Sequence, residues 1–156
     1  MSARSWITLG AVLAGLSVGA GAFGAHVLDD YFAEKYREAG EKSVAGFSVP
    51  VSWERLQDFK TGVQYQMYHA LGMIAAGLLL QTRRRRALQA AAWCFLLGIC
   101  LFSGGLYLYT LTGQRIWGMI PPPIGGTSFI VGWIAMAIGA CPCGEPASHD
   151  ASSLGR

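Results

Sequence analysis

Two histidines are the residues of this chain best placed to do chemistry within apolar surroundings. His69 closes a polar stretch that begins at Gln64, and His26 ends an apolar run that begins near Ser5. Histidine changes charge near neutral pH, and ionisable residues within apolar helices are candidates for binding or proton transfer. The two imidazoles are therefore the first candidates for a functional site.

Other polar side chains recur near these histidines at helical spacing. One arc of about 140° on a helix starting near Thr61 holds Thr61, Gln64, Tyr65, Tyr68, His69 and Gly72. Ser103 and Tyr107 lie one turn apart in a later apolar run. Placing such groups against lipid costs free energy, so they should face protein or water. We therefore predict one polar cluster in the outer half of the molecule, made of His26, Gln64, Tyr65, Tyr68, His69, Ser103 and Tyr107.

Three kinds of chemistry suit such a cluster. It can be a hydrogen-bond network that fixes helix register, a site for a proton, ion or small molecule, or a b-type haem site using two facing histidines. No cofactor is expected, because His26 and His69 do not match well in depth. No enzyme is expected either, since the sequence has no nucleophile and base pair, no phosphate-binding loop and no carboxylate within the apolar runs.

The cysteines do not suggest a disulfide framework or a metal site. Cys94 and Cys100 lie within an apolar run, and Cys141 and Cys143 follow the last one. His149 is the nearest further ligand to the second pair, which is too few for a typical zinc site. We expect reduced thiols and no metal.

The elements that hold these residues follow from the distribution of charge. Only 13% of residues are charged, against about a quarter in soluble domains. Charge is absent from four windows, each long enough to cross a bilayer as a helix of about 20 residues. The expected fold is an all-α integral membrane four-helix bundle, one domain over residues 1–144, followed by a disordered cytoplasmic tail at 145–156. The expected spans are 5–28, 61–82, 87–111 and 122–141.

The first run also has features of a secretory signal peptide. Arg4 precedes it, and Ala20 to Ala22 resembles a cleavage site. The run is long for a signal and continues past that site to Val27, so we favour a membrane span. Both interpretations orient the rest of the chain in the same way.

Orientation is predicted from the basic residues. Arg83, Arg84, Arg85 and Arg86 form a short turn that the positive-inside rule places in the cytoplasm, where it would contact anionic lipid headgroups. Both termini are then cytoplasmic. The loop at 29–60 lies outside and is expected to hold short amphipathic helices, one of them beginning near Ser52. Its near-balanced charge gives no sign of nucleic-acid binding.

Small residues and prolines predict how the helices pack. Gly15, Gly19, Ala22 and His26 share one face of the first helix, which we expect to pack closely on a neighbour. Gly104 and Gly105 are expected to bend the third helix or to admit a neighbouring helix. The last helix is expected to start at Pro122 or Pro123, followed by Gly125 and Gly126.

Four stretches together carry a family resemblance: GAFGAHVL at 21–28, TGVQYQMYHALG at 61–72, FSGGLYLYTLTG at 102–113 and PPIGGTSFIVGW at 122–133. They resemble the small bacterial inner-membrane proteins numbered 423 among domains of unknown function, a family similar to transmembrane protein 256. The resemblance implies four membrane helices without an established activity, substrate or cofactor.

The resemblance also bears on individual residues. It matches His26, His69, Ser103 and Gly104, and the helix-start residues Pro123, Gly125 and Gly126. Gly105 and Pro122 replace a common serine and threonine, which removes two hydroxyl groups from the proposed cluster. The outer loop is also longer than usual.

The function we expect is structural, in assembly or in binding other membrane components. The alternative is a minimal small-molecule or proton-linked transporter with its polar site in the outer half of the bundle. Lipids are the expected partners, with a homo-oligomer or another membrane protein also possible.

Overall fold

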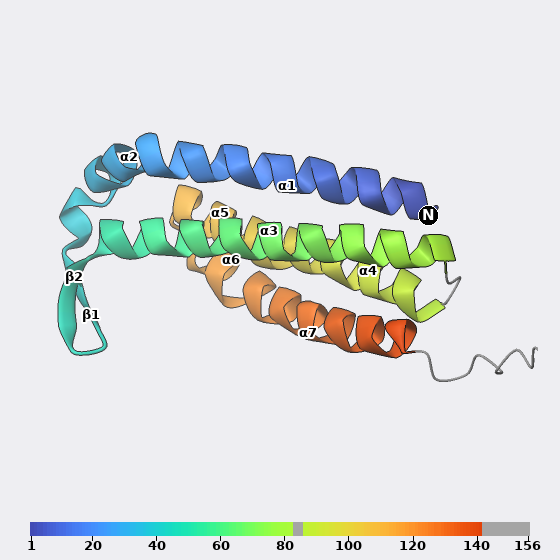
Figure 1. The fold of residues 1–156 in the computed structure, drawn as a ribbon. Helices are drawn as coiled ribbons and strands as arrows, with labels where there is room; N and C mark the ends of the chain where they lie inside the picture. The colour runs from blue at the N-terminus through green and yellow to red at the C-terminus, as the bar shows by residue number, and fades with distance from the viewer. Residues whose placement is uncertain (83–85, 142–156) are drawn as a thin grey trace, which may run out of the picture.

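The computed structural model describes residues 1–82 and 86–141. Its long helices run side by side (Figure 1). In chain order they are α1 (Ala3–His26), α3 (Val51–Thr82), α4 (Arg86–Gly98) continuing through the π-helix η2 (Ile99–Ser103) into α5 (Gly104–Thr112), and α7 (Pro121–Ala140). Successive members run in opposite directions. The expected turn residues Arg83, Arg84 and Arg85 and the expected tail at 145–156 lie outside the described residues.

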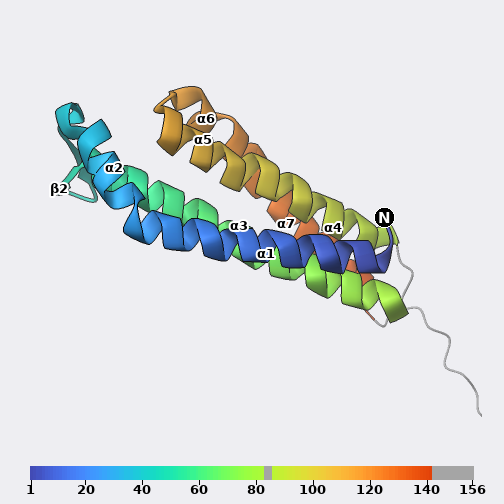
Figure 2. The ribbon, with the colours of Figure 1, turned by 90° about the horizontal axis from the view of Figure 1, so that it is seen from above.

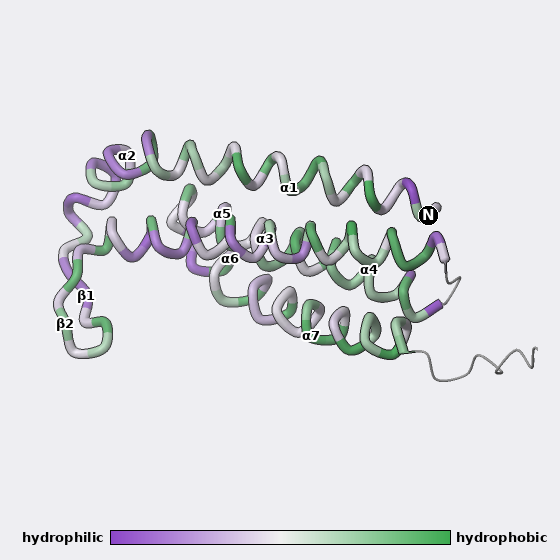
Figure 3. The backbone as a smooth tube through the Cα atoms, in the orientation of Figure 1, coloured by the Kyte–Doolittle hydropathy of each residue, from purple (hydrophilic) through white to green (hydrophobic). Residues whose placement is uncertain are grey.

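Three helical stretches are long and apolar enough to cross a membrane. They cover Ala3–His26, Arg86–Thr112 and Arg115–Ala140. The second expected span lies in α3, which is not among them, because Gln64, Gln66 and His69 make its middle less apolar. Figure 3 shows hydrophilic residues along the first half of α3, where the other long helices are mostly apolar.

The loop between α1 and α3 differs from the expected one. It contains the short helix α2 (Leu28–Lys35), the 3₁₀ turn η1 (Arg37–Ala39) and the strands β1 (Glu41–Val44) and β2 (Phe47–Pro50). The strands pair antiparallel with Val44 opposite Phe47. Ala45 and Gly46 both have positive φ, as a two-residue hairpin turn requires. No strands were predicted in this loop.

The second amphipathic helix expected in this loop is not a separate element. α3 begins at Val51 and continues without interruption to Thr82. The buried positions Leu56, Phe59 and Gly62 follow one another at helical spacing across the expected boundary at Thr61, so one apolar face continues from loop to core.

α3 is the central helix. It contacts α1, α4, η2 and α5, while α4 and α7 pack on each other (Figure 2). The main core comprises Trp6, Ala70, Met73, Ala76, Leu80, Leu88, Ala91, Ala92, Phe95, Ile99 and Phe129. A second cluster of Leu28, Phe32, Leu56 and Phe59 lies where α2 meets α3.

The predicted glycine face of α1 does not pack on another helix among the described residues. An added Cβ at Gly15 or Gly19 would have no described atom within 4 Å, and Ala22 and His26 are exposed. The packed face carries Trp6, Gly10, Ser17 and Gly24 instead. An added Cβ at Gly10 would lie 2.8 Å from the Ala70 carbonyl oxygen, so this glycine allows the close approach to α3.

The last two helices are joined by α6 (Arg115–Met119). α5 ends at Gly113, whose positive φ of 75° suits a left-handed helix cap. α7 then begins at Pro121, one residue before the expected start, because proline is tolerated where the first-turn N–H groups have no helical partner.

Candidate functional site

The polar side chains in the middle of α3 bind to all the other long helices. Gln66 is buried, and its amide nitrogen donates to the Leu13 carbonyl of α1 at 2.9 Å. Its amide oxygen accepts the Tyr107 hydroxyl of α5 at 3.0 Å. Both ends of one side chain are thus engaged by two different helices.

His69 lies one turn further along α3 and joins it to α7. Its Nδ1 lies 2.8 Å from the Tyr65 carbonyl oxygen, and the Trp133 indole N–H donates to its Nε2 at 3.2 Å. A carbonyl only accepts and an indole N–H only donates, so these partners fit a neutral ring protonated on Nδ1. Adding a second proton would break the bond from Trp133.

Aromatic rings close the space around His69. Phe129 stacks on the imidazole with ring centroids 3.4 Å apart and planes 8° from parallel. Phe95 packs at 5.6 Å, and Tyr65 packs on Phe102 at 4.6 Å. His69 is only 5% exposed. We call His69 with Tyr65, Phe95, Phe102, Phe129 and Trp133 the aromatic cluster.

The structure brings together some of the predicted residues and separates others. His69 and Tyr107 join the interior through Trp133 and Gln66, and Tyr65 packs in the aromatic cluster although its side chain remains 38% exposed. Gln64, Tyr68 and His26 are exposed. No hydrogen bond or ring contact within the described ranges involves His26, so the two histidines do not form a common site.

Ser103 is fully buried, and its hydroxyl has no hydrogen-bond partner in the described structure. It is the last residue of η2, the π-helical turn that follows α4. The sequence predicted a bend at Gly104 and Gly105, but the irregularity lies just before them. π turns occur often at functional sites, and a buried unpaired hydroxyl is uncommon.

Gln66 is the functional residue that the sequence analysis missed. A signal for it existed, because Phe59, Gly62, Gln66, His69, Met73, Ala76 and Leu80 follow one another at alternating spacings of three and four. All seven are buried. That heptad spacing marks a packed seam, and the arc chosen from polar residues alone was rotated away from it.

Some of the expected helix-start residues of α7 are buried against other helices, and others are not. Pro122 and Gly125 are buried, and Pro123 is exposed. A Cβ at Gly125 would lie 2.5 Å from the Phe102 backbone nitrogen, while one at Gly126 would lie 3.8 Å from the Phe102 ring. Gly125 therefore permits the approach of α7 to η2, and Gly126 does not take part in it.

A second polar group lies at the end of the molecule that carries α2. The Arg55 guanidinium packs over the Tyr109 ring at 4.0 Å and lies 3.6 Å from the Asp58 carboxylate. Tyr36 donates its hydroxyl hydrogen to the Thr110 carbonyl at 2.8 Å. Lys42 pairs with Glu54, which raises the pKa of Lys42. These contacts fasten α2 and the hairpin to α3 and α5.

Groups of three or more histidine, cysteine or acidic side chains arranged to hold a metal are absent from residues 1–82 and 86–141. Cys143 and His149, weighed above as ligands beside Cys141, lie outside the described residues. Cys94 and Cys100 are free thiols.

Comparison with known proteins identifies the family. The model of a protein family of unknown function, DUF423, matches residues 20–126. The chain belongs to the DUF423 family. No solved structure matched it.

Curated members of the DUF423 family are similar over nearly their whole length. A UPF0382 membrane protein of Staphylococcus epidermidis is 40% identical over 86% of this chain and 93% of its own. The UPF0382 membrane protein YwdK of Bacillus subtilis is 39% identical over 88% and 96%. The UPF0382 inner membrane protein YgdD of Escherichia coli K12 is 31% identical over 90% and 92%. With its apolar helices, this DUF423 chain is a membrane protein.

Proposed function

We propose that this protein is a structural component of a bacterial inner membrane, without enzymatic activity, whose polar core fixes the register of four membrane spans. The observation that carries this proposal is the bonding of His69, whose two ring nitrogens both have partners within the chain. A proton carrier needs a ring nitrogen that can exchange its partner. Here Phe129 stacks on the imidazole and Trp133 occupies Nε2, so neither offers room for another partner.

The proposal counts α3 as the fourth span. α1 ends at the same end of the molecule at which α3 begins, and α3 ends at the end where α4 begins (Figure 1). If α1 and the α4–α5 stretch cross the membrane, α3 must cross it to join them. Its polar side chains are acceptable there, because Gln66 and His69 face other helices and not lipid. The positive-inside rule then puts both termini in the cytoplasm.

The proposed assembly role uses the outer face of α1. Gly15 and Gly19 form a G-x-x-x-G motif that no other helix of the chain covers. This spacing allows two copies of one helix to cross closely in lipid. We therefore propose a second copy of this chain as the occupant of this face.

The assembly role is tested by the mass of the protein in a mild detergent. We expect a dimer for the wild type and a monomer for Gly19→Ile. The control is Ala137→Ile, which enlarges an exposed small residue on α7 and should remain dimeric. A monomeric wild type would overturn the proposed dimer.

The role of His69 is tested by comparing His69→Ala with the wild type. A structural role predicts a lower melting temperature for His69→Ala at neutral pH, with a smaller difference from the wild type in acid, where a second proton on His69 would break the bond from Trp133. Proton flux into liposomes, followed with an enclosed pH-sensitive dye, should be at the background level for both proteins. Flux above background that His69→Ala abolishes, while the variant remains folded, would contradict the structural role.

One observation favours the alternative of a minimal transporter. The buried Ser103 hydroxyl has no partner and lies in a π turn. A transport site would use this hydroxyl for its substrate, so Ser103→Ala would lower flux. A structural position would tolerate the change or gain stability, since an unsatisfied buried group is removed.

A further inference from the structure

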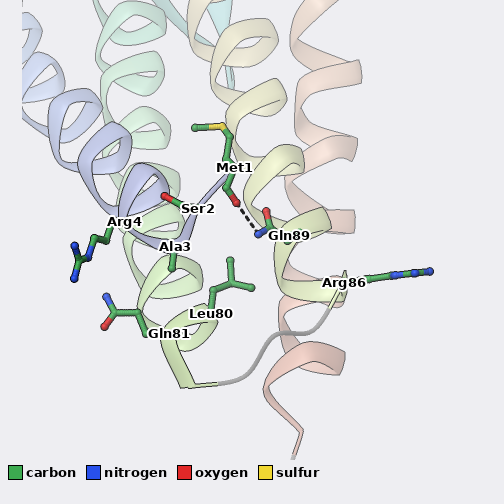
Figure 4. Close-up of a pocket in the computed structure, with 8 residues that line it drawn as sticks. All are labelled: Met1, Ser2, Ala3, Arg4, Leu80, Gln81, Arg86 and Gln89. Carbon is green, nitrogen blue, oxygen red and sulfur yellow. Dashed lines mark hydrogen bonds between the residues drawn. The ribbon is translucent and has the colours of Figure 1, made fainter.

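A pocket of about 730 Å³ lies at the end of the molecule opposite α2 (Figure 4). It is formed where α1 and α4 begin and α3 ends. Its lining residues are Met1, Ser2, Ala3, Arg4, Leu80, Gln81, Arg86 and Gln89. The pocket is remote from the aromatic cluster and plays no part in the proposed function above.

One wall of the pocket is held in place by hydrogen bonds. The Trp6 indole N–H donates to the Gln89 amide oxygen at 2.8 Å, and the Gln89 amide nitrogen donates to the Met1 carbonyl at 2.9 Å. Trp6 itself is fully buried. The beginning of α1 is thus fixed against α4, and the space between them is part of the folded structure.

The charge around this pocket is positive and uncompensated. Arg4 and Arg86 line the pocket, but in Figure 4 their side chains point outward in opposite directions, so both must turn inward to reach a shared ligand; neither forms an ion pair with a described residue. Every aspartate and glutamate of the described ranges falls between Asp29 and Asp58, in or near α2 and the first turns of α3. A ligand with negative charge therefore meets two guanidinium groups and no carboxylate among the lining residues.

The surroundings define the class of ligand. The pocket combines guanidinium and amide donors with the apolar side chain of Leu80, next to helices that are apolar enough for lipid contact. Guanidinium groups bind phosphate oxygens by charge-assisted hydrogen bonds. Arginine side chains are long enough to turn inward from both sides onto one phosphate.

We propose that this pocket binds the phosphate of an anionic glycerophospholipid, with Arg4 and Arg86 as the two cationic contacts. The headgroup occupies the polar mouth beside Gln81, and the glycerol lies toward Leu80. The site holds one lipid headgroup, in contrast to the diffuse attraction that any basic surface exerts on an acidic membrane.

The test counts phosphatidylglycerol molecules bound to the whole chain in neutral detergent micelles by native mass measurement. We expect one tightly bound lipid on the wild type, with phosphatidylcholine bound far more weakly. Arg4→Gln combined with Arg86→Gln should weaken binding about thirtyfold, because each basic residue contributes about fivefold. The matched control is Lys60→Gln with Arg115→Gln, which removes the same charge away from the pocket and should bind as the wild type does.

A second variant separates the pocket from general charge attraction. Gln81→Trp fills the pocket and keeps every arginine, including those from Arg83 to Arg85, so it should lose the bound lipid if the pocket is the site. Retained binding in Gln81→Trp would overturn the proposal even if the arginine variant failed to fold. Equal binding of phosphatidylcholine would also overturn it.

A last comparison separates lipid from free phosphate. Inorganic phosphate and glycerol phosphate, added at the concentration of the lipid, should not displace phosphatidylglycerol. Displacement by either would show that the site recognises a free anion, and the lipid assignment would be wrong.

Discussion

Gln66 is the residue on which the arrangement of three helices depends. Its amide is held by the Leu13 carbonyl on one side and the Tyr107 hydroxyl on the other. In an apolar interior each lost partner leaves a polar group without water to replace it. A sliding movement of α1 or α5 along α3 would break one of these bonds, so the side chain selects a single register.

We expect Gln66→Leu to lower the free energy of unfolding by about 1–2 kcal/mol, since two polar groups lose their partners in the interior. Gln64→Leu is the matched control, because Gln64 is exposed on the same helix. Unfolding by sodium dodecyl sulfate in mixed micelles measures both. Equal losses for the two variants would show that the Gln66 contacts do not contribute.

Asp58 gives a pH dependence at the opposite end of α3. Burial raises the pKa of this carboxyl, repulsion from the Glu54 carboxylate adds to the rise, and the Arg55 guanidinium opposes it. The folded state therefore binds more protons than the unfolded state just above the ordinary carboxyl pKa of about 4. In that window the contribution of Asp58 to stability falls as the pH rises.

We expect Asp58→Asn to remove this fall, which appears as a difference between the stability curves of the variant and the wild type against pH. Glu54→Gln should narrow the window by removing repulsion, and Arg55→Gln should widen it by removing attraction. The measurement is unfolding followed by circular dichroism between mildly acidic and neutral pH. Parallel curves for Asp58→Asn and the wild type would exclude a raised pKa.

At the scale of elements, α7 approaches η2 closely enough that one glycine decides the contact. A Cβ at Gly125 would lie 2.5 Å from the Phe102 nitrogen, and backbone cannot move aside as a flexible side chain can. The neighbouring Gly126 has its nearest such atom at 3.8 Å, which is ordinary contact. Gly125 is thus required for the close contact with η2, whereas Gly126 is not.

We expect Gly125→Ala to destabilise the protein by about 1–3 kcal/mol through overpacking. Gly126→Ala should leave stability unchanged or raise it by up to about 1 kcal/mol, because alanine favours a helix more than glycine does. Thermal unfolding in the same detergent compares the two. A tolerated Gly125→Ala would mean that α7 packs less closely on η2 than described.

The helices were largely predictable because charge and length constrain them strongly. Charge-free windows and the prolines before α7 place three membrane-length helical stretches. The hairpin was not predictable in the same way, since its four-residue strands are almost entirely exposed and leave no burial pattern. A helix was predicted to begin near Ser52, close to the true start of α3 at Val51, but as a separate element. Its continuity with the span was missed because charged residues such as Glu54 suggested a loop, while the buried face continues through them.

The candidate site was predictable only in part. Residue type pointed to His69 and Tyr107, but it also drew in Gln64, Tyr68 and His26, which are exposed. The alternating spacing of three and four residues through Gln66 predicts the buried positions better. Burial in α3 follows this spacing more closely than it follows residue polarity. His26 could not be placed from sequence, because the packed face of α1 is set by its residues Gly10 and Gly24, which lie against α3.

For the whole molecule, charge and topology are connected. Described carboxylates lie only from Asp29 to Asp58, whereas Arg4 and Arg86 are at the far end of the helices. If all four long helices cross the membrane, as proposed above, the positive-inside rule puts the hairpin outside the cell and the start of α1 inside.

We expect a cysteine at Gly46, in the hairpin turn, to react in intact cells with a thiol reagent that cannot cross the membrane. A cysteine at Ser2 should react only after the cells are opened. Both substitutions are made in a chain whose four natural cysteines are replaced by serine or alanine. Labelling of both positions in intact cells would show that α3 does not carry the chain across the membrane.

The π turn at Ile99–Ser103 has a consequence for how this chain tolerates changes of length. A π turn corresponds to one residue inserted into an α-helix, and each residue of an α-helix turns the chain by about 100°. A single deletion within these five residues would remove the inserted residue and restore regular winding, so α5 would keep the Tyr107 hydroxyl turned toward Gln66. The same deletion within α5, before Tyr107, would instead rotate this hydroxyl by about 100° about the helix axis and break its bond to Gln66.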